Sequence, residues 1–310
     1  MDKVNILYCF DSKSWQMVAV SMESLLSNTN LTTHLTIYCM VVPGTKGQGK
    51  IKKIIKSHKN RASLVWREID ASENPFQAPE YSKWGPTTFY SLVAHRFFKD
   101  IDKILYLNPS TLIYHDLSEL FNTDISDYAL GAVPDMAPVN DDSSSLGVIV
   151  RDFSQKYLNN GLYYNGGVLL LNLKKMAECE KSLLDTNIQL RYPLQDLLNV
   201  ALVGKIKTLP LKYNLAPGTP VPSHFSQEET AEVNAGKHVI VDCYYSKPYD
   251  KQRIHNLVYE AFVKYAKNIG MTPEMFVKAD EKRAEVKKTF VPHVSVRQGK
   301  ILFFGMKISK

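Results

Sequence analysis

A predicted buried strand ends in a short polar loop at residues 108–110, where side chains could perform chemistry. Residues 103–107 (KILYL) are apolar and β-prone, and Asn108-Pro109-Ser110 breaks the run. In an α/β protein, ligands bind at the loops that follow the carboxyl ends of the central strands. A divalent cation there would need carboxylates, because hard cations prefer charged oxygen ligands. The chain supplies an amide and a hydroxyl instead, so we expect no tightly bound metal.

Polar side chains also follow or end the other predicted strands. They are Asp11 after residues 4–10, Asp70 after 63–69, Asp135 after 128–133 and Asp242 at the end of 238–242. The carboxyl ends of parallel strands meet at one edge of a sheet, so these residues are expected to share a nucleotide crevice. Each alone could equally be a turn or helix cap. Neither GxGxxG nor GxxxxGK[ST] occurs, so dinucleotide-binding and P-loop sites are not supported.

The elements that must position these residues alternate between strands and helices. Strands are predicted at 4–10, 35–42, 63–69, 103–107 and 128–133, and helices from Trp15 through Leu26, at 46–59 and at 88–98. This alternation predicts a largely parallel sheet covered on both faces. The polar stretch 140–161 is predicted to be a long loop or lid.

Composition favours a protein of the cytoplasm. The chain has 310 residues, 45% of them hydrophobic, without the run of about 20 apolar residues that spans a bilayer. An acid at residue 2 and a short strand-like run argue against a secretory signal. The four cysteines form no CxxC pair, which fits buried free thiols in a reducing compartment.

The positive charge is concentrated near the C-terminus. Residues 278–310 contain nine Lys or Arg and three acids, a balance of +6 out of the net +7 of the chain. The rest is nearly neutral, which argues against nucleic-acid binding. Basic residues mixed with apolar ones such as Phe303 and Phe304 suit an anionic membrane surface, and peripheral contact with the inner face of the membrane is one expectation. The alternative is a C-terminal helix with a solvated face.

The second half of the chain carries four motifs in a fixed order. They are GLYYNGGVLLLNLKKM (161–176), PLQDLLNVAL (193–202), LPLKYN (209–214) and VIVDCYYSKPY (239–249). Together with residues 103–133 they closely resemble glycosyltransferase family 8, a GT-A-fold family of bacterial hexosyltransferases and glycogenin-like enzymes. The resemblance covers roughly residues 4 to 250. It implies a GT-A α/β domain over 1–265, followed by a basic, apolar tail over 266–310.

The resemblance also implies a reaction and roles for individual residues. Members of the family transfer a hexose from a UDP-sugar, with retention, to a glycan or lipid-linked acceptor, as in the synthesis of lipopolysaccharide or cell-surface glycans. By this resemblance Asn165 faces the donor sugar, and Gln195 lies beneath the anomeric carbon. Asp196 completes the QD pair, Asp135 approaches the sugar hydroxyls and Lys247 contacts the diphosphate.

The chain departs from the family pattern around one pocket. Two changes concern the metal site: Asn108-Pro109-Ser110 replaces the Asp-x-Asp that holds Mn²⁺ or Mg²⁺, and Val241 takes the place of a histidine ligand. Beside the nucleotide, Ser12 and Lys13 replace a tyrosine and an asparagine. Elsewhere around the pocket, Ser91 replaces an arginine and Leu194 replaces an acid. The expected donor side therefore consists of Asp11, Ser12, Lys13, Asn108, Ser110 and Lys247, without a metal ligand.

Two functions remain open at this point. A metal-free glycosyltransferase would use Lys13, Arg96 or Lys247 to neutralise the leaving UDP. A pseudo-glycosyltransferase would bind a partner, a nucleotide or a glycan without catalysis, and a membrane-bound sensor is a weaker third alternative. The retained Asp135, Asn165, Gln195 and Lys247 favour the enzyme. The other motifs have structural explanations: tight glycine packing in NGGVLLLN, architecture in LPLKYN and a helix N-cap at Asn172.

Overall fold

The structure is a computed structural model. It describes residues 2–59, 61–76, 85–136, 161–186, 192–243, 247–289, 292–297 and 300–305, of which residues 285–305 are described by their backbone alone. The predicted lid at 140–161 lies outside these residues except for Gly161, and so do the side chains of Phe303 and Phe304.

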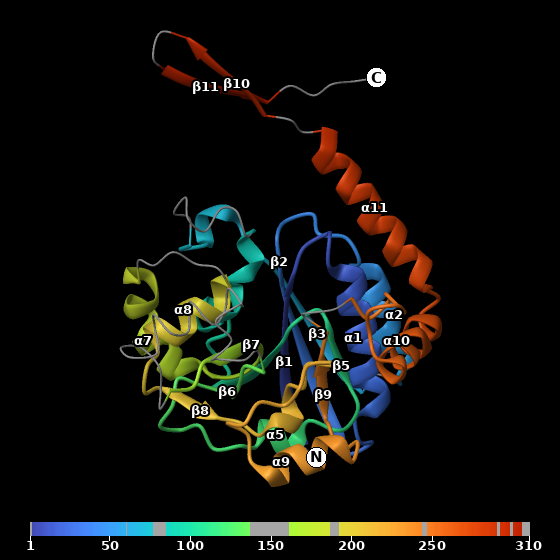
Figure 1. Cartoon of the computed structure of the whole chain (residues 1–310). Helices are drawn as coiled ribbons and strands as arrows, with labels where there is room; N and C mark the ends of the chain where they lie inside the picture. The colour runs from blue at the N-terminus through green and yellow to red at the C-terminus, as the bar shows by residue number, and fades with distance from the viewer. Residues whose placement is uncertain are drawn as a thin grey trace.

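A seven-stranded mixed sheet forms the centre of the molecule (Figure 1), with the strand order β3-β2-β1-β4-β7-β6-β8. Its strands are β1 (Asp2–Phe10), β2 (Thr33–Val41), β3 (Ala62–Glu68), β4 (Lys103–Leu107), β6 (Leu130–Pro134), β7 (Tyr164–Asn172) and β8 (Ile206–Thr208). β7 runs antiparallel to both neighbours, and the other pairs are parallel. The predicted, largely parallel sheet is confirmed. The reversal of β7 places its first residues beside the carboxyl ends of β4 and β6.

Helices cover both faces of this sheet. They are α1 (Trp15–Asn28), α2 (Gln48–Ser57), α4 (Ala94–Phe97), α5 (Ser118–Phe121), α7 (Leu173–Asp185), α8 (Pro193–Ala201), α9 (Gln227–Asn234), α10 (Asn256–Asn268) and α11 (Pro273–Thr289), with the 3₁₀ turns η1 (Ala71–Glu73), η2 (Pro86–Thr88), η3 (Tyr90–Val93) and η4 (Leu211–Tyr213). In Figure 1, α1, α2 and α10 lie on one side of the sheet, and α7 and α8 lie on the other.

Two predicted helix details had different outcomes. Asn172 caps α7 as predicted, because its Oδ1 accepts a hydrogen bond from the backbone N–H of Lys175 (3.2 Å). The single helix predicted at 88–98 is wrong: η2, η3 and α4 divide this segment. Its β-branched and aromatic residues lose side-chain freedom in an α-helix, which favours short tight turns.

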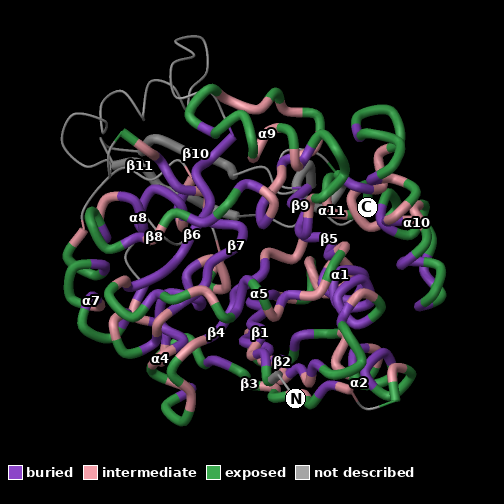
Figure 2. The backbone as a smooth tube through the Cα atoms, turned by 90° about the horizontal axis from the view of Figure 1, so that it is seen from below, coloured by how far each residue is buried: buried purple, intermediate pink, exposed green. Residues whose placement is uncertain are grey.

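The core has two layers because the central strands are buried on both faces (Figure 2). Along β1, alternate side chains point to opposite faces. Ile6, Tyr8 and Phe10 pack into the cluster that contains α1, α2 and α10. Leu7 and Cys9 pack into the cluster that contains α7 and α8. This alternation holds β1 rigidly at the centre, with the loop after Phe10 at the carboxyl edge.

A second, two-stranded sheet joins β5 (Thr111–Ile113) to β9 (Ile240–Asp242) in antiparallel register. The prediction that residues 238–242 are a further parallel strand ending at Asp242 is therefore wrong. The turn at residues 108–110 follows β4 directly and leads into β5, whose edge pairs with β9. The backbone N–H of Cys243 also bonds to the carbonyl oxygen of Ser110 (3.2 Å), which fixes this small sheet to the turn.

The C-terminal segment begins as part of the packed structure. Phe276 of α11 is buried against Phe262 and Tyr249, with ring centroids 5.0 and 5.4 Å away. Beyond α11, strands β10 (Pro292–Arg297) and β11 (Lys300–Gly305) form an antiparallel hairpin. The division of the chain at residue 265 stays a prediction. In the described parts of the chain, every helix is too short or too polar to cross a membrane.

Gly167 marks the closest approach of the small sheet to β7. A Cβ atom on Gly167 would lie 1.9 Å from Oδ2 of the buried Asp242 and 3.0 Å from Oδ1 of Asn165. Real Cβ atoms do not tolerate the first of these contacts, so Asp242 would have to move. Gly166 differs, because its Cβ would meet Leu194 at an ordinary 3.4 Å. Neither glycine is among those with a positive φ.

These contacts predict unequal effects of two alanine substitutions. Gly167→Ala should lower the free energy of unfolding by about 2 kcal/mol through overpacking. Gly166→Ala is the matched control and should stay within about 0.5 kcal/mol of the wild type. Urea denaturation of both variants measures the difference. Equal stability of the two variants would contradict the close contact between Gly167 and Asp242.

Candidate functional site

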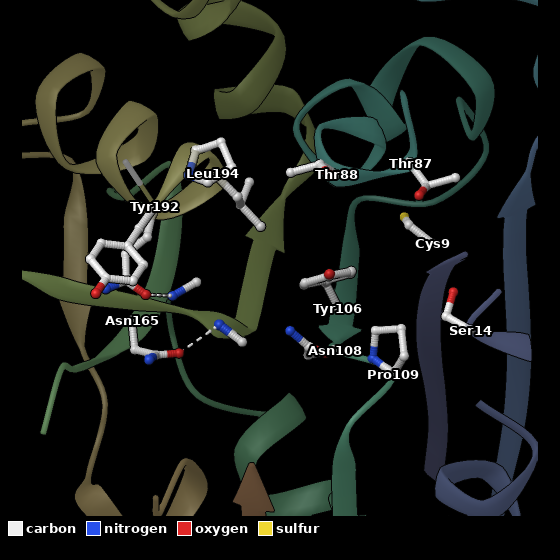
Figure 3. Close-up of a pocket in the computed structure, with 14 residues that line it drawn as sticks. Cys9, Ser14, Thr87, Thr88, Tyr106, Asn108, Pro109, Asn165, Tyr192 and Leu194 are labelled. Carbon is white, nitrogen blue, oxygen red and sulfur yellow. Dashed lines mark hydrogen bonds between the residues drawn. The ribbon is translucent and has the colours of Figure 1, made fainter. Parts of the chain in front are cut away.

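A cavity of about 260 Å³ opens where the carboxyl ends of β1 and β4 meet the start of β7 (Figure 3). It is lined by Cys9, Ser14, Thr87, Thr88, Tyr106, Asn108, Pro109, Asn165, Gly166, Gly167, Tyr192, Pro193, Leu194 and Gln195. In Figure 3, Cys9 and Ser14 stand on one side of the opening, and Asn165 and Tyr192 stand on the other. Amides and hydroxyls supply its polar groups, and none of these lining residues carries a full charge.

The buried carboxylate of Asp135 organises the polar wall of this cavity. Asp135 follows β6 and is 1% exposed. Its Oδ2 accepts one hydrogen bond from Nδ2 of Asn165 (3.0 Å) and another from Nε2 of Gln195 (2.5 Å). A buried carboxylate is stable only when donors surround it. The carboxylate therefore fixes which end of each amide is nitrogen, and so directs both amide oxygens elsewhere.

The two amide oxygens have different environments. Oδ1 of Asn165 accepts from the N–H of Gly167 (2.7 Å) and from Nδ2 of Asn214 (2.9 Å), which uses both of its lone pairs. Oε1 of Gln195 accepts from the N–H of Gly166 (3.1 Å). Among the described residues, the N–H of Gly166 is the one donor to Oε1, so a second lone pair of this oxygen remains. A fixed oxygen of this kind, at the wall of a cavity, can stabilise a developing positive charge.

Asp196 does not line the cavity, although it follows Gln195 directly. It is fully buried, and its oxygens accept from the hydroxyl of Tyr163 (2.5 Å) and from the N–H of Tyr192 (2.7 Å). Burial and the adjacent Asp196 carboxylate raise the pKa of Tyr163 well above its ordinary value. Tyr163 therefore stays a protonated donor to Asp196. In this structure Asp196 anchors the segment that carries Tyr192 to the cavity wall.

The loop after β4 is held by its own polar groups. Oδ1 of Asn108 accepts from the N–H of Ser110 (3.1 Å), and the N–H of Asn108 donates to the carbonyl of Gly167 (2.8 Å). The hydroxyl of Ser110 donates to Oδ1 of Asp242 (2.6 Å). Asp242 is 3% exposed, and Val241 beside it is equally buried. Asn108 thus reaches the cavity, whereas Ser110 turns toward Asp242.

The loop after β1 presents Ser14 to the cavity through Asp11. Oδ1 of Asp11 accepts from the N–H groups of Lys13 (2.8 Å) and Ser14 (3.2 Å). Ser12 and Lys13 are exposed, and the hydroxyl of Ser12 accepts from the N–H of Lys46 (3.0 Å). Lys13 therefore lies at the rim, one residue from the lining. Asp11, Asn108, Asp135 and Asn165 all lie at one edge of the sheet, and of these four Asn108 and Asn165 line the cavity.

Three other predicted residues lie outside the cavity lining. Asp70 caps η1 in a capping box with Glu73, so Asp70 has the helix-cap role that was the alternative to a role in the site. Lys247 is exposed and forms an ion pair with Asp280 of α11. Arg96 bonds to Glu180 (2.5 Å) in a separate groove between α4 and α7, so its predicted role at the diphosphate is wrong.

Two buried asparagines were missed as site residues. The amide of Asn199 pairs with both the N–H and the carbonyl of Tyr164 (2.8 Å each), and so fixes the start of β7. Its signal was the four-residue spacing from Gln195, which puts both on one face of α8. Asn214 orients Asn165, in line with the architectural role predicted for LPLKYN. Among the described residues, no group of three His, Cys, Asp or Glu side chains could hold a metal ion.

Two curated relatives are similar to this chain in sequence. The chain is 32% identical over 219 residues to a lipopolysaccharide 1,2-glucosyltransferase of Escherichia coli, and 26% identical over 219 residues to the protein of that name in Escherichia coli (strain K12). Each match covers 68% of this chain and 62% of the relative, so the chain spans less than two thirds of the length of these relatives.

A solved structure shares the fold. The galactosyltransferase LgtC in complex with donor and acceptor sugar analogues superposes with a TM-score of 0.64 and 20% identity, over 90% of this chain and all of that chain. This likeness confirms the expected GT-A fold. The profile of glycosyl transferase family 8 matches residues 5–240, more than half of the sequence. The chain therefore belongs to glycosyl transferase family 8.

Proposed function

We propose that this protein transfers a hexose from a UDP-sugar to a hydroxyl group of a glycan or lipid-linked acceptor, with retention and without a bound metal. The observation that carries the proposal is the pair of amides, Asn165 and Gln195, fixed by Asp135 at the wall of the cavity. Family membership supports the reaction class, and the relatives named as lipopolysaccharide glucosyltransferases support a cell-surface glycan as the acceptor.

The proposed reaction breaks the bond between the anomeric carbon and the phosphate oxygen and forms a bond from that carbon to the acceptor oxygen. The acceptor hydroxyl gives its proton to the departing phosphate. Positive charge develops on the sugar ring during the transfer. Oε1 of Gln195 stabilises that charge, because its remaining lone pair belongs to an amide that Asp135 and Gly166 hold in place. Asn165 orients the sugar from the same wall.

The residues present do not fit a tightly bound Mn²⁺ or Mg²⁺. Such cations prefer one or two carboxylates and a fixed shell of charged oxygens. The described lining of the cavity contains no carboxylate, Asn108 directs its oxygen to Ser110, and Asp242 accepts the hydroxyl of Ser110. We therefore assign neutralisation of the leaving diphosphate to basic side chains.

The first test compares donors with and without metal. UDP and the UDP-sugars of glucose, galactose and N-acetylglucosamine should be screened by thermal shift in Mn²⁺ and in EDTA. At least one should stabilise the protein to the same extent in both. UDP release from that donor should continue in EDTA, and Gln195→Ala should reduce its rate by at least about tenfold. Gln227→Ala, an exposed glutamine on α9, is the matched control and should keep the wild-type rate.

The outcomes separate the alternatives. Binding of a UDP-sugar without turnover, in EDTA and in Mn²⁺ alike, would favour the pseudo-glycosyltransferase. A tenfold gain in affinity with Mn²⁺, about 1.4 kcal/mol, would refute the metal-free site. Loss of binding by Gln195→Ala together with a lower melting temperature would show a structural role for that residue instead.

For the C-terminal segment we propose contact with an anionic membrane. Residues 290–310 contain Arg297, Lys300, Lys307 and Lys310, no acid, and several apolar residues. Each basic residue near an anionic surface contributes about 1 kcal/mol. Such contact would bring the cavity close to a lipid-linked acceptor.

Sedimentation with lipid vesicles tests this proposal. The full chain should bind vesicles that contain phosphatidylserine, and salt should weaken the binding. A chain that ends at Thr289 should bind at least about tenfold less, because four positive charges are removed. Neutral phosphatidylcholine vesicles are the control. Equal sedimentation of the two chains on anionic vesicles would rule out the segment as the membrane contact.

A further inference from the structure

The neutral lining of the cavity leaves an electrostatic requirement unmet. A nucleotide-sugar diphosphate carries one negative charge on each phosphate, and the leaving group gains charge as the sugar departs. Amides and hydroxyls can donate hydrogen bonds to phosphate oxygens but bring no compensating charge. Because the described lining residues include no carboxylate to hold a cation, we look for the charge in basic side chains at the rim.

Two basic side chains meet through α11, and one of them contacts the backbone of Lys13 at that rim. Arg283 donates from Nη1 to the carbonyl oxygen of Lys13 (2.6 Å) and also pairs with Asp280. Asp280 pairs in turn with Lys247. Two cations, Lys247 and Arg283, pair with one carboxylate and leave a net charge of +1. We call these three residues, with the Lys13 backbone that Arg283 contacts, the α11 cluster (Lys13, Lys247, Asp280 and Arg283).

The cluster adjoins the cavity rather than lying on a remote surface. Lys13 precedes Ser14, which lines the cavity, and both backbone N–H groups are held by Asp11. The side chain of Arg283 is 38% exposed, and the Lys247 side chain is 59% exposed. Both can therefore exchange part of their present contacts for an incoming anion.

The position of α11 is itself fixed by packing. Phe276 anchors the start of the helix in the core beside Phe262, and the hydroxyl of Tyr249 donates to Asp280 (2.5 Å) one turn later. Burial opposes ionisation of Asp280, but the hydrogen bonds from Lys247, Tyr249 and Arg283 outweigh it and lower the pKa of that carboxyl. Asp280 thus stays ionised at neutral pH and holds both cations.

We infer that α11 completes the donor site, with Arg283 as a diphosphate-binding residue and Asp280 as the residue that positions Arg283 and Lys247. Arg283 presents a planar fork of N–H donors that matches phosphate oxygens in pairs. The inference rests on the proposed function, because it takes a nucleoside diphosphate as the ligand. It adds a cation from a helix beyond the segment that matches the family profile.

Titration calorimetry in EDTA with UDP, UMP and uridine tests the inference. Arg283→Ala should weaken UDP binding by about tenfold and leave uridine binding unchanged, because uridine has no phosphate. The effect on UMP should be intermediate. Arg283→Lys should recover part of the UDP affinity, since it retains the charge without the fork. Lys282→Ala is the matched control: it removes an equal charge from the exposed neighbouring position of the same helix and should leave all three ligands unchanged.

Each other outcome has a separate meaning. UDP affinity that is unchanged in Arg283→Ala would refute the inference while leaving the proposed function intact. An equal loss for uridine and UDP would also refute it, because it would reveal a structural role for α11. Failure of the wild type to bind UDP at all would refute the proposed function itself. The melting temperature of each variant, measured without ligand, identifies any that fail to fold.

Discussion

A single buried carboxylate, Asp135, sets the arrangement of the whole candidate site. It cannot remain charged in the interior without donors, and Asn165 and Gln195 supply them from β7 and α8. The requirement works in both directions, since the carboxylate in turn fixes how each amide is rotated. Asn214 and the N–H groups of Gly166 and Gly167 then hold the amide oxygens. The polar wall is therefore preorganised before any sugar enters, which is the condition under which amide dipoles stabilise charge most effectively.

The topology explains why these groups meet. Asn165 would lie at the far edge of the sheet if β7 ran parallel to β4, but the reversed strand brings it to the carboxyl edge. The same reversal places Gly166 and Gly167 beside α8 and the small β5–β9 sheet. There Asp242 approaches the backbone so closely that only glycine fits. The reversed direction of β7 and the two glycines therefore depend on each other. The loop after β4 is fixed to them, because the N–H of Asn108 donates to the carbonyl oxygen of Gly167.

The sequence was sufficient for the fold and for part of the site, for identifiable reasons. Alternating strands and helices predicted the sheet, and motif order predicted the family. Asn108 was predictable because it directly follows a strand, whereas Asn165 was assigned from the family motif that contains it. The strand that carries Asp242 and the position of Arg96 were predicted wrongly, because the pairing of β9 with β5, and of α4 with α7, depends on contacts distant in sequence. Asp196 looked equivalent to Gln195 by adjacency, but neighbouring residues on a helix point in different directions. Arg283 gave no local signal, because its partner Lys13 is separated from it by 270 positions.

That separation has a consequence for how the protein is made. The loop that carries Lys13 emerges from the ribosome long before α11, and domains are synthesised at roughly 5–20 residues per second. The 270 residues between the two partners correspond to roughly 15 to 50 s of translation. In the last part of that interval, after Gln195 has been synthesised, the nascent chain contains every residue of the described cavity lining but still lacks α11. With the donor site that we propose, a nucleotide sugar would find its full binding site only on a chain that has been translated through α11, and not on its unfinished precursors.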